Sequence, residues 1–411
     1  MINFRTFTLD NGLQVIVHED PTVANAAVNI LYDVGSRDEA PDQTGFAHLF
    51  EHLMFGGSKN IPDYDTPLLQ VGGSNNAFTS PDITNYYVTV PTENLETAFW
   101  LESDRMLSLS FDPKVLEVQR KVVIEEFKQR YLDQPYGDLW LKLRPVVYQE
   151  HPYRWPTIGK DISHIEEATM QDVEEFFFKY YRPSNAIMVV AGNVDYDEVA
   201  RLAEKWFGGI ALAPKPERNL PQEPEQTEAR HLEVTADVPS DSLYKVYRMA
   251  GKYDPSFHPT DLLSDIIGRG KSSRLYKELV KDRRLFSNLG AHVLGSFDPG
   301  LLVVSGQPSM EVSLEEADKA VEGLLEKVRA QPVDEEELQK VKNQAEATLA
   351  FSEIDLLRRA IDLAMSAVQG RLDEVNEGAE KIQSVEASQV EEAAQEVLSP
   401  SNATTLYYRE A

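Results

Sequence analysis

The chain has 411 residues, enough for two sizeable domains with their own cores, and it lacks cysteine, which excludes disulfides and thiolate metal sites. Its 40 basic and 68 acidic residues give a net charge of −28 at pH 7. A phosphate backbone would be repelled, so we expect no nucleic-acid partner, and we attribute the charge to solubility rather than to attraction of basic peptides.

The N-terminal segment, from Phe4 to Glu19, predicts two strands joined by a turn at Asn11 and Gly12. No apolar stretch precedes it, so the sequence predicts neither an export signal nor a membrane span. We therefore expect a cytoplasmic protein as the chain stands, and a periplasmic one if a leader has been removed.

The helix expected over residues 46–54 contains the sequence His48-x-x-Glu51-His52. Offsets of three and four residues place these three side chains on one helical face. Two imidazoles one turn apart can chelate zinc, and the carboxylate beside them can act as a general base. The order is the reverse of the commoner H-E-x-x-H motif and is itself a catalytic motif. The alternative is an amphipathic helix that carries two histidines by chance.

A second helix is expected over residues 113–131, opened by an Asp-Pro pair. Four of its residues share a face that is otherwise apolar: Gln119, Val122, Val123 and Glu126. An acid on an inward apolar face needs a partner, so Glu126 is the expected third zinc ligand, whereas Glu125 points away. The alternative is that Glu126 only marks the edge of a solvated face. Gln119 is expected to hydrogen-bond a ligand, or else to be an ordinary packed glutamine.

Residues 213–229 have four prolines, many charges and few apolar side chains, which predicts an extended linker. The halves on either side share blocks of sequence in a common register, and the sequence Pro-Ser-Asn-Ala begins at both Pro183 and Pro400. We therefore predict two copies of one unit, a catalytic zinc-binding domain at 1–212 and a homologous second domain at 230–411 that lacks the metal motif.

Strand-like and helical segments alternate in both halves. The expected strands are 26–34, 85–90, 187–191, 243–249 and 301–306, and the further expected helices are 92–107, 313–330 and 334–350. This pattern predicts an α+β fold, in which each half forms a sheet with helices packed on one face.

The two motifs and the stretch between them resemble one known family. The sequence His48-x-x-Glu51-His52 is followed further along the chain by Glu126, as in the inverted-motif zinc peptidases, which include pitrilysin, insulin-degrading enzyme and the mitochondrial processing peptidase. Residues 72–80, with 84–87, resemble the substrate-binding edge strand of that family. The resemblance implies two related domains that face each other like a clam shell around a chamber.

The resemblance also implies the roles of individual residues. It gives zinc ligation to His48, His52 and Glu126, and general-base catalysis to Glu51. At Gln119 the chain departs from many relatives, which carry a second glutamate there. The edge strand is expected to dock a peptide substrate through its main chain, the alternative being an ordinary strand of the sheet. Its expected substrate-binding residues are Asn76, Ala77, Phe78 and Thr79.

We therefore predict a zinc-dependent peptidase that hydrolyses unfolded or short peptides. One rival is a catalytically inactive structural relative, which is disfavoured because all four chemical residues are present. A second rival is a peptide-binding module with a structural zinc, which is disfavoured because such sites usually have four protein ligands.

The second half lacks one expected contribution. In the active single-chain and homodimeric members of the family that the chain resembles, the second domain carries an arginine and, seven residues later, a tyrosine that contact the substrate carbonyl. Val280 and Ser287 stand at these positions, and neither can donate as that pair does. We therefore expect a heterodimer with a homologous partner subunit that supplies the Arg/Tyr pair, rather than a homodimer. If the register shifts, Arg283 or Arg284 would substitute.

Overall fold

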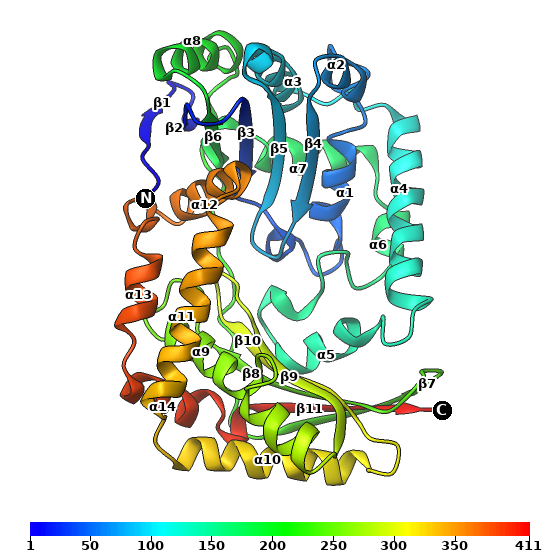
Figure 1. Cartoon of the computed structure of the whole chain (residues 1–411). Helices are drawn as coiled ribbons and strands as arrows, with labels where there is room; N and C mark the ends of the chain where they lie inside the picture. The colour runs from blue at the N-terminus through cyan, green and yellow to red at the C-terminus, as the bar shows by residue number, and fades with distance from the viewer. The chain divides into compact units, whose positions relative to one another are not determined.

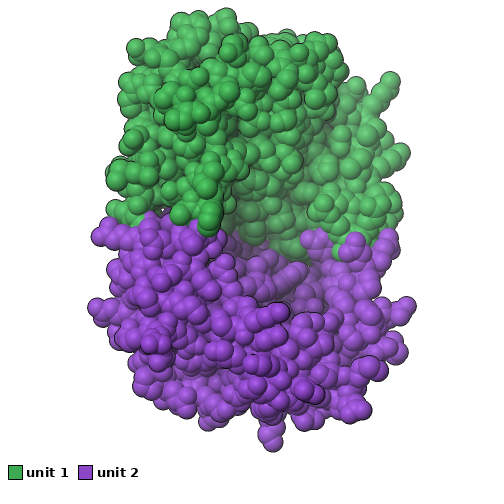
Figure 2. Space-filling view, viewed as in Figure 1, with its two compact units in different colours: residues 1–130, 155–221, 350–377 green, residues 131–154, 222–349, 378–411 purple.

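The computed structural model describes residues 1–411, which form two compact units, coloured separately in Figure 2. Unit 1 comprises residues 1–130, 155–221 and 350–377, and unit 2 comprises residues 131–154, 222–349 and 378–411. Each unit has one sheet and helices packed on it, so the predicted α+β fold is confirmed (Figure 1). No helix combines the length and the apolar composition needed to cross a lipid bilayer.

Unit 1 contains a six-stranded sheet with the strand order β1-β2-β6-β3-β5-β4. Its strands are β1 (Arg5–Thr8), β2 (Gln14–Glu19), β3 (Asn25–Tyr32), β4 (Ser74–Thr79), β5 (Thr84–Pro91) and β6 (Ala186–Gly192). The strands β1 and β2 are antiparallel around a turn in which Gly12 has φ +89°, so the predicted hairpin is confirmed. The strand β4 pairs only with β5, so the predicted edge strand is confirmed as well.

The helices of unit 1 include the two that the sequence singled out. They are α1 (Phe46–Leu53), α2 (Asp65–Gln70), α3 (Leu95–Leu107), α4 (Pro113–Phe127), α6 (Ser163–Glu166), α7 (Met170–Tyr180), α8 (Tyr196–Phe207) and α12 (Leu356–Val368). The helix α4 begins as predicted, because the Asp112 side chain accepts a hydrogen bond from the Lys114 N–H and Pro113 occupies the first helical position. A short π-helical segment, Lys128–Leu132, follows it.

The inward face of α4 differs from the predicted one. Leu116, Val123 and Phe127 are buried on it, whereas Val122 is 43% exposed. The prediction that Val122 lies inward is therefore wrong. The buried residues of α4 form a stripe along the helix, and Val122 lies beside this stripe rather than on it. Glu126 remains half-buried at the edge of that stripe.

Unit 2 contains a five-stranded sheet with the order β7-β11-β8-β10-β9. Its strands are β7 (Arg230–Ala236), β8 (Ser242–Met249), β9 (Phe286–Leu294), β10 (Gly300–Pro308) and β11 (Ala403–Glu410). Its helices are α5 (Leu139–Val147), α9 (Phe257–Gly268), α10 (Leu314–Ala330), α11 (Glu335–Ser352, whose end falls in unit 1), α13 (Gly378–Ser384) and α14 (Ala387–Val397).

The two sheets have the same topology, which confirms the predicted internal repeat. Beginning from β2 in one sheet and β7 in the other, the order and the directions of five strands coincide. In both, the first pair is parallel and the following pairs are antiparallel. The two Pro-Ser-Asn-Ala sequences lie at the starts of the equivalent strands β6 and β11.

The two halves of the sequence exchange equivalent helices. The helix α5, from the first half, packs on the sheet of unit 2, and α12, from the second half, packs on β3 and β6 of unit 1. Leu139 and Leu356, which begin these helices, are as far apart along the chain as Pro183 and Pro400, so they occupy equivalent positions in the repeat. The compact units thus differ from the predicted domains 1–212 and 230–411. Each sheet is buried on both faces, and the helix that covers one of these faces comes from the other half of the chain.

The predicted linker, residues 213–229, contains no helix or strand, as expected. Its first part is nevertheless fixed to unit 1. Lys215 Nζ lies 2.8 Å from an Asp33 carboxylate oxygen, and the Arg218 guanidinium binds both Asp33 and Asp38. Because Asp33 is only 5% exposed, these cations compensate a buried charge. The segment is therefore extended but anchored.

Beside the sheet of unit 1 lies a buried ion pair that gives a stability prediction. Glu102 and Arg105 have no exposed side-chain surface, and the guanidinium carbon lies 4.6–5.1 Å from the ring centres of Phe55, Tyr64 and Tyr86. Replacing Glu102 with alanine leaves the guanidinium buried without a counter-charge. We expect urea denaturation to show a loss of ~3–5 kcal/mol in the free energy of unfolding.

The matched control for this prediction is an exposed ion pair at the same helical spacing. Glu198 and Arg201 on α8 lie 2.8 Å apart, with 47% and 57% of their side-chain surfaces exposed. Because solvent screens this pair, the Glu198→Ala variant should keep nearly the wild-type denaturation midpoint. Equal losses in the two variants would contradict the prediction.

Candidate metal centre

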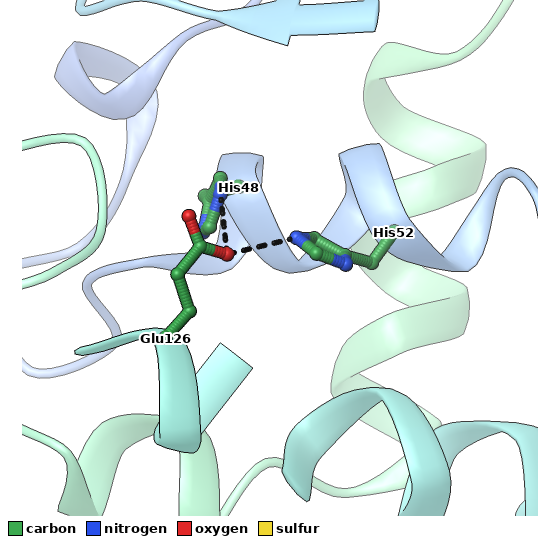
Figure 3. Close-up of side chains that lie close together, drawn as sticks. All are labelled: His48, His52 and Glu126. Atoms are coloured by element: carbon green, nitrogen blue, oxygen red, sulfur yellow. Dashed lines mark ion pairs between the residues drawn. The ribbon is translucent and has the colours of Figure 1, made fainter. Parts of the chain in front are cut away.

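The helices α1 and α4 bring His48, His52 and Glu126 together, as Figure 3 shows. Glu126 Oε2 lies 3.6 Å from His48 Nε2 and 3.3 Å from His52 Nε2. One potential ligand atom from each residue lies within 4.8 Å of the other two. The three residues that sequence reasoning selected as ligands are therefore neighbours in space.

The helix α1 presents its polar side chains opposite an apolar face. Its buried residues follow helical spacing: Phe46, Ala47, Leu49, Phe50 and Leu53. That face packs into the core of unit 1, so His48, Glu51 and His52 must lie on the other face. The Tyr86 hydroxyl also donates a hydrogen bond of 3.3 Å to the Phe50 carbonyl, which attaches the middle of the helix to the sheet.

The electrostatics of the cluster favour metal binding at neutral pH. Burial lowers the pKa of His48 to about 4 and outweighs the opposing effect of the Glu126 carboxylate, so the His48 imidazole is neutral. A hydrogen bond with His52 lowers the pKa of Glu126, so its carboxylate is charged. Two imidazoles and one carboxylate form a donor set typical of catalytic zinc, which keeps a further position open. The buried His48 Nδ1 has no protein partner, so no hydrogen bond fixes the ring tautomer.

Glu51 lies beside this cluster without joining it. The Thr79 hydroxyl donates a hydrogen bond of 2.6 Å to Glu51 Oε2. Burial raises the pKa of Glu51 above its usual value, and the neighbouring Glu126 charge acts in the same direction. A carboxylate with a raised pKa is a better proton acceptor than an exposed one, as a general base requires.

The Thr79 contact gives a prediction about activity. Thr79→Val keeps the branched shape but removes the donor, and a hydrogen bond to a charged group contributes ~1.5–3 kcal/mol. We expect a fall of about tenfold to hundredfold in kcat for peptide hydrolysis, with little change in KM. Thr79→Ser retains the hydroxyl and should keep most of the activity. Equal kcat values for the valine and serine variants would show that this hydrogen bond does not support the reaction.

The other predicted substrate and ligand-support residues lie nearby. Asn76, Ala77 and Phe78 belong to β4, whose outer edge has no strand partner, and Asn76 is exposed. Their role in substrate binding stays a prediction. Gln119 is half-buried on α4 and makes no hydrogen bond to the three clustered residues, so its role stays a prediction too.

Sequence reasoning missed two contacts of the site. One is the hydrogen bond from Thr79, which was predicted only to bind substrate. The other is Arg130, whose guanidinium lies 2.9 Å from Glu126 Oε1 and leaves Oε2 to face the histidines. The i,i+4 spacing of Glu126 and Arg130 could have indicated this ion pair. Nothing in the local sequence could have indicated the Thr79 contact.

Two family profiles match the chain. The profile described as "Insulinase (Peptidase family M16)" matches residues 14–152, which include all four residues of the site. The profile described as "Peptidase M16 inactive domain" matches residues 167–345. The two matches thus fall largely in different halves of the sequence.

Similar proteins and structures agree with these matches. "Zinc protease PqqE" of Helicobacter pylori is 35% identical over 349 residues, covering 82% of this chain and 77% of that protein. An uncharacterized zinc protease of Rickettsia bellii is 25% identical and covers 97% and 96%. The crystal structure of a protease from Helicobacter pylori superposes with a TM-score of 0.92 at 30% identity, covering both chains completely. Pitrilysin shares the fold, with a TM-score of 0.80 at 21% identity, and this chain covers 45% of its length.

Proposed function

The chain belongs to peptidase family M16, and we propose on that basis that it is a zinc-dependent endopeptidase of the inverted-motif class. The observation that carries the proposal is the geometry of the metal centre. His48, His52 and Glu126 offer three ligand atoms within 4.8 Å of one another, and Glu51 lies beside them with its carboxylate outside the ligand set. Relatives named as zinc proteases support zinc as the metal.

In the proposed mechanism each residue has a distinct task. His48, His52 and Glu126 would hold zinc, which when bound would polarise a peptide carbonyl and make a neighbouring water more acidic. Glu51 accepts a proton from the attacking water and returns it to the nitrogen of the leaving amine. Thr79 holds the Glu51 carboxylate by its Oε2 atom, which keeps the other oxygen available for the proton.

The proposed substrate is an unfolded or short peptide. The strand β4 ends the sheet, so the N–H and C=O groups along its outer edge can pair with an extended peptide. Such main-chain pairing tolerates many sequences but requires a segment free of its own secondary structure. Thr79 on this strand also contacts Glu51, so a peptide that pairs with Asn76, Ala77 and Phe78 would lie beside the general base.

The experiment that tests the function combines metal analysis with a cleavage assay. The purified protein should contain about one zinc per chain and should cleave a quenched fluorescent peptide of unstructured sequence. Removal of zinc with a chelator should stop cleavage, and added zinc should restore it. A protein that binds zinc but never cleaves peptides, with or without its homologues, would instead be a structural or peptide-binding subunit.

We further propose that full activity requires a homologous partner subunit. The chain covers less than half of pitrilysin and 48% of the Escherichia coli periplasmic protease PqqL, so it corresponds to half of such a molecule. In unit 2, Val280 packs against the hydrophobic core, and Ser287 donates its hydroxyl to the Gln307 carbonyl. Neither side chain is available to stabilise the developing oxyanion of a substrate.

The partner proposal predicts a measurable defect of the isolated chain. The loss of an oxyanion donor typically costs ~10²–10³ in rate, so the chain alone should cleave the peptide that much more slowly than the complex. Mixing with a zinc-less homologue that carries the Arg/Tyr pair should restore the rate, and size-exclusion chromatography should show a heterodimer. Full activity of the isolated monomer or homodimer would contradict the proposal.

A further inference from the structure

The two-turn helix α1 carries both histidines and Glu51, yet the residue at its N-terminus cannot cap it. The N-cap residue is Gly45, which has φ +90°, a conformation that L side chains rarely adopt. A Cβ atom at this position would lie 2.6 Å from the Ile158 carbonyl oxygen, so a larger residue would not fit. Glycine has no side chain to accept hydrogen bonds from the unpaired N–H groups of the first helical turn.

A carboxylate from outside the helix accepts these hydrogen bonds. Glu39 Oε2 accepts from the Gly45 N–H at 3.0 Å, and Glu39 Oε1 accepts from the Ala47 N–H at 2.8 Å. Glu39 is only 7% exposed, so both oxygens are committed to this contact. Burial raises the pKa of the Glu39 carboxyl. The two N–H donors act against this shift, because they hydrogen-bond to the charged carboxylate. The charged form also interacts favourably with the positive end of the helix dipole, so Glu39 serves as a helix cap supplied from an earlier part of the chain.

The three functional residues of α1 depend on this cap to different degrees. His48 lies in the first turn and directly follows Ala47, whose N–H Glu39 holds. Glu51 and His52 lie in the second turn, next to Phe50, whose carbonyl is held by the sheet. Because a helix that loses its cap frays from the end, the first turn moves first. Loss of the Glu39 contact should therefore displace His48 more than the other two residues.

We propose that Glu39 is a positioning residue of the metal centre, which fixes the first turn of α1 so that His48 faces Glu126. This inference rests on the proposed zinc function, but it concerns a residue outside the H-x-x-E-H motif and outside the ligand set. Glu39 acts through the backbone of α1. It contributes neither a ligand atom nor a proton to the reaction.

The test measures metal binding in the full chain with Glu39 replaced by glutamine. Glutamine keeps the size of the side chain but presents an NH₂ donor to one of the two N–H groups, so one contact becomes repulsive. We expect the Kd for zinc, measured by competition with a chromophoric chelator, to rise about tenfold to hundredfold, as for other groups that orient ligands. With Co²⁺ as the probe, the visible absorption of the folded variant should show a changed ligand geometry. If the glutamine variant does not fold, zinc affinity and the Co²⁺ spectrum are measured instead with the shorter Glu39→Asp variant, which keeps the charge.

The matched control is another carboxylate cap in the same unit. Asp195 accepts a hydrogen bond from the Glu198 N–H at the start of α8, so Asp195→Ala should lower the thermal midpoint without changing zinc affinity. If the Glu39 variants lose only thermal stability and keep the wild-type zinc affinity and Co²⁺ spectrum, the proposal is overturned. If the wild-type chain itself binds no zinc, the proposed function fails instead, so the two failures are distinguishable.

Discussion

Replacing Glu51 with glutamine is expected to lower kcat for peptide hydrolysis by ~10²–10⁴ while the protein keeps its zinc. The carboxylate lies outside the ligand set, so its loss removes the proton acceptor without removing a ligand. Glutamine is nearly isosteric and can still accept the hydrogen bond from Thr79, so the local structure should persist. The measurements are zinc content by elemental analysis and steady-state cleavage of an unstructured peptide.

The complementary variants act on the metal itself. His48→Ala and His52→Ala each remove one of the three ligand atoms, so both should lose zinc and activity together. The distinction between Glu51→Gln, which keeps zinc, and the alanine variants, which lose it, separates the base from the ligands. Near-normal turnover by Glu51→Gln would show that another group accepts the proton.

Glu126→Gln should weaken zinc binding by more than the ~10–100-fold that loss of a ligand-orienting group costs, because it alters a ligand directly. The Glu126 side chain is 18% exposed, and its Oε2 atom faces both histidines. Replacing the charged carboxylate with a neutral amide removes the negative charge of the ligand set. Zinc affinity is measured by competition with a chelator of known affinity.

The adjacent residue offers a control with the same chemistry. The Glu125 side chain is 60% exposed and pairs with Lys128 at 2.8 Å, away from the histidines. Glu125→Gln should therefore leave zinc affinity close to the wild-type value. Similar losses in the two variants would indicate a general charge effect, and a larger loss in Glu125→Gln would place the ligand on the other residue.

Most of the secondary structure followed from local patterns in the sequence. The strand-like segment 85–90, the Asn-Gly turn and the Asp-Pro start of α4 predicted elements that are present, with bounds differing by a few residues. The packing partner of each face did not follow from these patterns. The helical spacing of Val122 predicts an inward position on α4, but burial depends on which elements pack against the helix, and Val122 is 43% exposed.

The division into units shows a similar limit. The linker composition and the repeated Pro-Ser-Asn-Ala blocks predicted two related halves, and the two sheets confirm the repeat. The exchange of α5 and α12 between the halves was not predictable, because both helices are amphipathic segments that could cover either sheet. The choice of sheet is made by the long-range packing of the whole chain.

The sequence by itself determined the chemistry of the candidate site. The spacing of His48, Glu51 and His52 sets three side chains on one face of a helix, because the helical repeat is a local property of the backbone. The sequence also predicted Glu126 as the third ligand, but the tertiary structure alone decided which side chains support these residues. Folding brings Glu126 within 3.3 Å of His52, a Thr79 hydroxyl to Glu51 and the Glu39 carboxylate to the start of α1. These contacts join separate elements, and their formation depends on the packing of α1 against α4 and the sheet.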